Sequence, residues 1–155
     1  MENHKKEPLL EKLIAEATKL VAERGHIVPE PDGILTPQGA YAKGMSLAEY
    51  IHHLNAPLNT VCNGLGVSHD AFMKLTRQEQ LLAFLVYDGT LSHRKAAFVY
   101  RDYRLSGSIE QFRKRNTPEL YIDTLRTPTS RGSGWATYFL TNRKPELTDT
   151  SSEEE

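Results

Sequence analysis

Apolar residues recur every three or four positions near the start of the chain, between Pro8 and Gly25. This spacing predicts an amphipathic helix over residues 8–25. Pro8 suits the first turn, where N–H groups have no partner within the helix, and Gly25 is a typical C-terminal stop. The apolar face of this helix has two interpretations: it packs on its own domain, or it makes a homodimer contact through residues 8–25.

Prolines and glycines interrupt the pattern over residues 26–39, which we expect to form a loop. Ser46 and Glu49 then have the spacing of a capping box, in which each side chain binds a backbone N–H group of the other residue. The apolar positions that follow predict a short helix as far as about Leu54.

The pattern from residue 55 to residue 75 predicts a helix through Val61, a glycine-containing turn at 65–68 and a second helix over 68–75. This second helix carries one aspartate and one lysine, which is poor equipment for a groove lined by phosphates. We therefore interpret residues 1–75 as an N-terminal helical region that serves as a scaffold or a dimerisation surface.

Three further helices are expected in the second half of the chain, each with its own start and stop signals. They run from the capping box of Thr76 and Glu79 to Gly89, from Ser92 to Gly107, and from Ser108 to just before Pro118. The period then changes, because residues 120–126 and 135–141 are rich in β-branched and aromatic side chains and predict two strands. The expected fold class is mainly α with a C-terminal β-hairpin.

Charge is unevenly distributed, although the net charge is only −1. Residues 76–144 hold twelve basic and six acidic residues, and nine of the twelve are arginine. Residues 145–155 hold five acidic residues and no basic one, which predicts a disordered acidic tail. The basic block favours a polyanion partner, because arginine binds phosphates and base edges well. The alternative is a chance cluster of solvated side chains.

Three helices followed by a hairpin with a glycine-rich basic tip, "RGSGWATYFLT", resemble a winged helix domain of the helix-turn-helix superfamily. The resemblance covers residues 76–142 and lies in the layout, so it indicates the superfamily and no particular family. It implies a winged helix-turn-helix domain over residues 76–144 with an N-terminal helical extension. It also implies that the third helix lies in the major groove, while the hairpin tip, or wing, contacts backbone or minor groove.

Within the third helix, Ile109 and Phe112 can face the core, which leaves the polar side chains outside. Arginine can pair with guanine and glutamine with adenine, and a serine at a helix start can hold a phosphate. The preceding helix start is where such domains contact the DNA backbone. The expected DNA-contacting residues are therefore Ser108, Gln111, Arg113, Lys114, Arg115, His93, Arg94 and Lys95. Alternatively, Arg113, Lys114 and Arg115 only complement the helix dipole.

Arg131 lies in "TPTSRGSGW", residues 127–135, where one proline and two glycines exclude a helix. Glycine imposes no side-chain barrier to a phosphate, and a narrow minor groove attracts a guanidinium group. We therefore expect Arg131 to contact DNA and Trp135 to anchor the hairpin on the core. The alternative is a hairpin loop with an incidental arginine.

No motif for enzymatic or metal chemistry accompanies these features, so we expect a non-enzyme without a cofactor. His52 and His53 are adjacent, so on a helix they point about 100° apart and cannot easily share a metal. Cys62 is the only cysteine, which excludes an internal disulfide and fits a reducing compartment. No apolar run approaches the length of a membrane span. We expect a cytoplasmic protein, or a nuclear one in a eukaryote.

The leading hypothesis is a small transcriptional regulator that binds double-stranded DNA. It would use the helix at 108–115 in the major groove and the wing at 127–134 on backbone or minor groove. The alternative is a protein-interaction adaptor whose winged helix surface docks an acidic partner. A third hypothesis is binding to single strands through the alternating Tyr and Arg residues of 98–104, although helical spacing favours packing of Phe98 and Tyr103.

Overall fold

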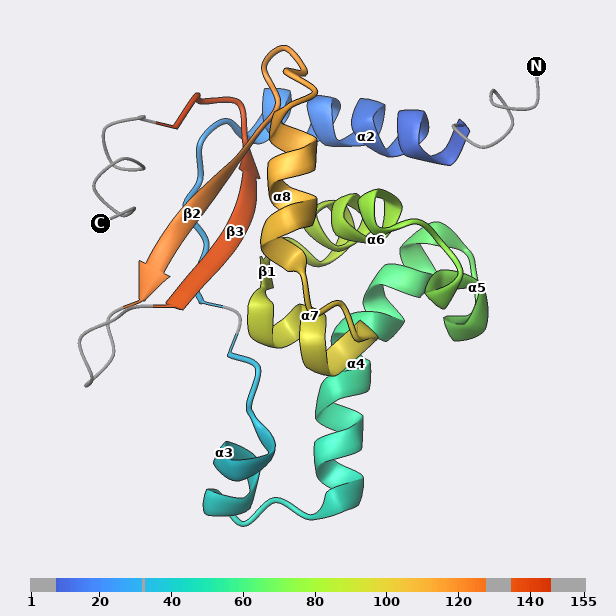
Figure 1. The fold of residues 1–155 in the computed structure, drawn as a ribbon, viewed down its shortest axis with the longest axis vertical. Helices are drawn as coiled ribbons and strands as arrows, with labels where there is room; N and C mark the ends of the chain where they lie inside the picture. The colour runs from blue at the N-terminus through green and yellow to red at the C-terminus, as the bar shows by residue number, and fades with distance from the viewer. Residues whose placement is uncertain (1–7, 32, 128–134, 146–155) are drawn as a thin grey trace.

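The computed structural model describes residues 8–31, 33–127 and 135–145. In chain order its elements are α2 (Pro8–Arg24), α3 (Pro37–Ala42), α4 (Leu47–Leu65), α5 (His69–Met73), α6 (Arg77–Ala83), the π-helical turn η1 (Phe84–Asp88), β1 (Leu91–Ser92), α7 (His93–Tyr100), α8 (Leu105–Arg113), β2 (Tyr121–Thr127) and β3 (Trp135–Thr141). The fold is mainly helical with a small antiparallel sheet near the C-terminus, as expected (Figure 1). No helix in the described ranges is long and apolar enough to cross a membrane. The expected tail lies outside these ranges, except for Pro145.

The sheet has three strands in the order β1-β3-β2, and both pairings are antiparallel. The expected hairpin is present, with Tyr121 opposite Thr141 and Leu125 opposite Thr137. The additional strand, β1, has two residues and pairs Leu91 with Tyr138. Because β3 has a neighbour on each edge, its backbone is enclosed, and its residues from 136 to 141 are buried.

The first helix, α2, is present as expected and ends at Gly25, whose φ of 75° suits a glycine. Its apolar face, formed by Leu10, Leu13, Ala17 and Val21, is buried in the core of its own chain. The structure therefore agrees with the interpretation that this helix packs on its own domain, and it gives no support to a homodimer contact through residues 8–25.

A cluster of three aromatic rings holds the centre of the core together. The rings of Phe84 and Tyr100 stack with their centroids 4.9 Å apart. The ring of Phe72 makes an edge-type contact with each of them, at a centroid distance of 5.6 Å. Phe72 belongs to α5, whereas Phe84 and Tyr100 belong to η1 and α7. The N-terminal helical region therefore shares one hydrophobic core with the elements that follow residue 76.

Helix α4 opens with its expected capping box but continues through Pro57 to Leu65, where we expected two separate helices. A proline inside a helix costs about 3 kcal/mol because one hydrogen bond is lost. Burial of Leu58, the next residue, and of Val61, one turn later, offsets this cost. The helix ends at Gly66 with a left-handed φ of 75°.

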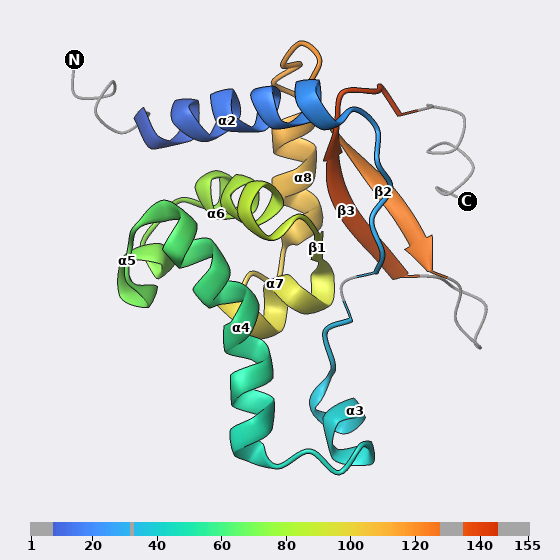
Figure 2. The same ribbon diagram turned by 180° about the vertical axis from the view of Figure 1, so that it is seen from behind.

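Helix α3 begins inside the stretch that we expected to be a loop, residues 26–39, and continues to Ala42. Thr36 caps it, since the side-chain oxygen accepts a hydrogen bond of 3.0 Å from the N–H of Gly39. Pro37 occupies the first position of the helix, where its missing N–H has no cost. Together with the first half of α4, α3 projects away from the remaining elements, as opposite views show (Figures 1 and 2).

Candidate nucleic-acid interface

Helices α7 and α8 meet at a turn formed by residues 101–104. Helix α7 begins at the expected cap, Ser92, but ends at Tyr100, and α8 begins at Leu105 instead of Ser108. We expected Gly107 to separate the two helices, yet it lies inside α8. A glycine within a helix costs about 1 kcal/mol, and burial of Leu105 one turn before the expected start more than offsets this amount.

Backbone geometry and one carboxylate shape this turn. Arg101 adopts a left-handed conformation with φ 63° and ends α7. The carboxylate of Asp102 then accepts a hydrogen bond of 3.0 Å from the N–H of Arg104, directly before α8. Asp102 is buried, with 3% of its surface exposed, so this hydrogen bond holds the turn on a side chain that is itself fixed in the fold.

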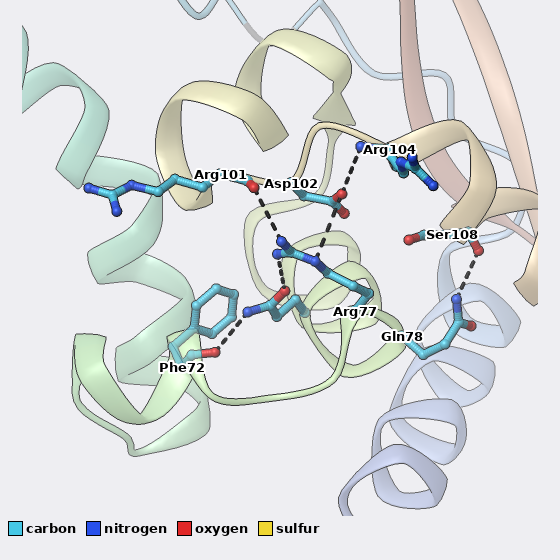
Figure 3. Close-up of polar contacts among 8 residues, drawn as sticks. Phe72, Arg77, Gln78, Arg101, Asp102, Arg104 and Ser108 are labelled. Carbon is cyan, nitrogen blue, oxygen red and sulfur yellow. Dashed lines mark hydrogen bonds and ion pairs between the residues drawn. The ribbon is translucent and has the colours of Figure 1, made fainter.

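A side chain of α6, Arg77, contacts the turn and stabilises it (Figure 3). The guanidinium of Arg77 donates to the carbonyl of Arg101 at 3.2 Å and lies 3.9 Å from the carboxylate of Asp102. It also donates to the side chain of Gln80 at 2.8 Å, and Gln80 in turn donates to the carbonyl of Phe72 at 3.0 Å. This network joins the end of α5, the first turn of α6 and the α7–α8 turn.

Ser108 lies within α8, and its side chain does not cap the helix. The residue is buried, and its carbonyl accepts a hydrogen bond of 2.9 Å from the side-chain amide of Gln78 (Figure 3). The expectation that Ser108 holds a phosphate at the helix start is therefore wrong. Its position instead fixes α8 on α6.

The exposed face of α8 is polar and lies opposite its buried side. The buried side chains are those of Leu105, Ser108, Ile109 and Phe112. At about 100° per residue, the opposite face consists of Gly107, Glu110, Gln111 and Lys114, and all four are exposed. Two of the expected DNA contacts, Gln111 and Lys114, therefore lie side by side on the outer face of α8.

The two arginines near the end of α8 differ in their contacts. Arg113 is exposed, yet its guanidinium donates a hydrogen bond of 2.8 Å to the carbonyl of Ile122 and so ties α8 to β2. Arg115 is exposed and follows the helix. Arg113 thus has a structural contact besides any contact with DNA.

The residues at the start of α7 that we expected to contact DNA also differ in their exposure and in their contacts within the fold. His93 is exposed, and its ring lies near Tyr138, with 3.5 Å between Nε2 and the phenol oxygen. Arg94 is half-buried and donates a hydrogen bond of 3.0 Å to the carbonyl of Ile34. Arg94 therefore fastens the segment that leads to α3.

Lys95 is buried, with 3% of its surface exposed. Its ammonium forms an ion pair with Asp88 and donates to the carbonyl and hydroxyl oxygens of Thr90 at 3.0 and 3.1 Å. These three acceptors satisfy the ammonium within the fold. The expectation that Lys95 contacts DNA is therefore wrong.

The turn itself exposes Arg101, Tyr103 and Arg104, which the sequence pattern indicated for single-strand binding but not as contacts with duplex DNA. Tyr103 is 74% exposed, whereas Tyr100 takes the buried place that helical spacing suggested for Tyr103. Phe98, which we also expected to pack, is 39% exposed. The alternation of Tyr and Arg in the sequence was the only signal for these exposed residues. It indicates an exposed turn only once it is known that α7 ends at Tyr100.

The electrostatics of the turn and helix are dominated by positive charge. Residues 101–115 include five basic and two acidic residues, and one of the acids, Asp102, is buried. Beneath the turn, burial strongly raises the pKa of the Tyr100 phenol, Asp102 raises it further, and Arg77 acts in the opposite direction. The phenol of Tyr100 is therefore harder to ionise in the folded protein than in water.

The expected wing residue, Arg131, lies outside the described residues. The strands that lead to this segment are described, and Thr127 pairs with Trp135 where the hairpin opens. Trp135 is the first residue of β3. The predicted contact of Arg131 with DNA and the predicted anchoring by Trp135 stay predictions.

No protein-family model, no curated protein and no solved structure matches this chain.

Proposed function

We propose that residues 77–141 form a winged helix domain that binds double-stranded DNA. The order of elements supports this proposal: α6, α7 and α8 precede the hairpin β2–β3, and β1 joins that hairpin from between α6 and α7. In this arrangement α8 is the helix that enters the major groove. The segment between β2 and β3 is the wing, which contacts backbone or minor groove.

The observation that carries the proposal is the polar outer face of α8 on a rigid support. Gln78 and Arg77 hold α8 and its preceding turn through hydrogen bonds to backbone carbonyls. A helix fixed in this way loses little conformational freedom when it binds, which favours affinity. The major groove is wide enough to admit one α-helix.

The residue types on that face suit base edges and phosphates. Gln111 can pair with adenine, Glu110 can accept a hydrogen bond from cytosine, and Lys114 can bind guanine or a phosphate. Gly107 has nothing within 4 Å of the place a Cβ would take, so the helix backbone is open to close approach. Arg101 and Arg104 are exposed just before the start of the helix, where they would contact phosphates of the DNA backbone.

The proposed role of this DNA-binding protein is that of a small transcriptional regulator. The chain has 155 residues, and its α2–α5 region packs on the proposed DNA-binding unit as part of one core. No separate catalytic unit is proposed. The alternative, an adaptor that docks an acidic protein partner, would use the same basic face and is distinguished by experiment.

The test is selection of binding sites from random duplexes, followed by affinity measurements over a salt series. We expect affinity to fall steeply between about 50 and 200 mM salt, because several phosphate contacts release counterions. Arg104→Ala should reduce the slope of log affinity against log salt by about one unit. Arg24→Ala is the matched control, since this exposed arginine ends α2 and lies outside the proposed interface.

Absence of duplex binding at low salt would refute the proposal, and capture of an acidic protein would then favour the adaptor. One observation favours a further candidate, which is binding to unpaired nucleic acid. Tyr103 is 74% exposed between two arginines, and exposed aromatic rings stack on bases of single strands. A preference for unpaired oligonucleotides over duplexes would select this candidate.

A further inference from the structure

Residues 34–57 form an arm that consists of α3 and the first half of α4, and both views show it extending from the body (Figures 1 and 2). The arm has internal structure. The hydroxyl of Tyr50 donates to the carbonyl of Leu35 at 2.7 Å, and Nε2 of His53 accepts from the N–H of Leu35 at 3.1 Å. Its position therefore depends on specific contacts within the chain.

Helix α4 carries one apolar seam along its whole length. The seam consists of Leu47, Ile51, Leu54, Leu58, Val61 and Leu65, whose spacing alternates between four and three residues. This spacing is the heptad pattern of helices that pair with another helix. Leu58, Val61 and Leu65 belong to the core of the chain or pack on it. By contrast, Leu47 is 75% exposed and Ile51 is 49% exposed, so the seam continues beyond the body.

The arm is also unusual in composition. Tyr41 on α3 is 85% exposed. Lys43 and Glu49 are the only Lys, Arg, Asp or Glu residues in the sequence between Gly33 and His69. Helix faces in water normally carry charges, whereas the centres of protein interfaces are poor in charge and rich in aromatic residues. The composition is thus that of an interface.

We propose that the arm pairs with the arm of a second copy of this chain. A second copy supplies the same seam, and two identical surfaces can meet across a twofold axis. One Lys and one Glu give the arm no net charge, so two arms do not repel each other. A strongly basic or acidic partner would find no complementary charge on this surface.

In an antiparallel pair, position a of one heptad seam meets position d of the other, so the register that uses the exposed end of the seam sets Leu47 of one copy against Ile51 of the other. The heptad spacing of the seam supports this register, because knobs from each helix then enter holes on the other. The proposal does not depend on DNA binding. It moves the dimer contact from α2, whose apolar face is buried, to the arm.

The test is sedimentation velocity of the full chain at several concentrations, without DNA. We expect a species of twice the 17.5 kDa chain mass. Ile51→Glu should weaken self-association at least ~100-fold, because the twofold axis introduces the charge into the interface twice. Ile27→Glu is a matched control, since Ile27 is 52% exposed but lies outside the arm, and it should leave the dimer intact.

Cysteines at positions 47 and 51 give a second measurement. If Leu47 of one copy faces Ile51 of the other, an oxidised mixture of Leu47→Cys and Ile51→Cys chains should form a covalent dimer with one chain of each kind, whereas a mixture of Leu47→Cys and Ile27→Cys chains should not. The natural Cys62 is buried and should not interfere. A wild-type chain that stays monomeric at high concentration would overturn the proposal. So would a dimer that survives Ile51→Glu with unchanged affinity, or one cross-linked as readily through position 27.

Discussion

The side-chain amide of Gln78 donates a hydrogen bond of 2.9 Å to the backbone carbonyl of Ser108, which lies in the middle of α8. Both residues are buried, and they are 30 positions apart in the sequence. The bond therefore fixes how α8 sits on α6. In the proposed function it also fixes how α8 meets DNA.

Gln78→Ala should lower the free energy of unfolding by about 2 kcal/mol, because the hydrogen bond and the buried stem of the side chain are both lost. Urea denaturation measures the change. Gln38→Ala on α3 is the control, since Gln38 is exposed and its loss should cost less than about 0.5 kcal/mol. Equal stability of the two variants would mean that the bond contributes nothing to the fold.

Lys95 is expected to contribute to stability and not to DNA affinity. Lys95→Met leaves the carboxylate of Asp88 without its ion-pair partner, so the free energy of unfolding should fall by roughly 3 kcal/mol. The double variant with Asp88→Asn should recover part of this loss, since the unpaired charge is gone. Lys114→Met is the exposed control for stability. A Lys95→Met protein that keeps its stability but loses DNA affinity would contradict this prediction.

Tyr100 should make the fold sensitive to alkaline pH. Burial raises the pKa of its phenol above the ordinary value of 10.0, so this residue's stabilising effect is complete below pH 10 and is lost as the pH rises further. Among the described residues, its hydroxyl has no hydrogen-bond partner. Tyr100→Phe should therefore change stability at neutral pH by less than about 1 kcal/mol and reduce the alkaline loss.

The measurement is denaturation of wild type and Tyr100→Phe at a series of pH values, together with the absorbance change of phenol ionisation. Tyr41→Phe is the control, because Tyr41 is 85% exposed. An alkaline loss of stability that is the same in wild type and Tyr100→Phe would rule out Tyr100 as its cause.

Features set by neighbouring residues were predictable from the sequence. The capping boxes that begin at Ser46 and Thr76, and the cap at Ser92, each join a side chain to a backbone group three positions away. The strands β2 and β3 were likewise visible in their β-branched and aromatic residues. These signals are local, so they need no knowledge of the remaining fold.

Features set by distant contacts were not predictable in this way. The strand β1 exists because Leu91 pairs with Tyr138. Lys95 is buried because its acceptors come from Asp88 at the end of η1 and from Thr90 just before β1, and no helical period marks that relation. The start of α8 depends on core space for Leu105. For these reasons the pattern selected Gln111 and Lys114 for the outer face but did not predict that residues 101–104 form an exposed turn before α8.

The outer face of α8 allows a sharper test of the proposed function, because two neighbouring exposed residues should act differently. Gln111→Ala should cost about 1–3 kcal/mol on the preferred duplex and relax the preference at one base position, since glutamine can pair with adenine. Lys114→Ala, as loss of a phosphate contact, should weaken binding to preferred and unrelated duplexes by similar factors. Site selection and affinity measurements at fixed salt, with each variant, separate these outcomes. If both variants keep the wild-type affinity and preference, α8 is not the helix that reads DNA.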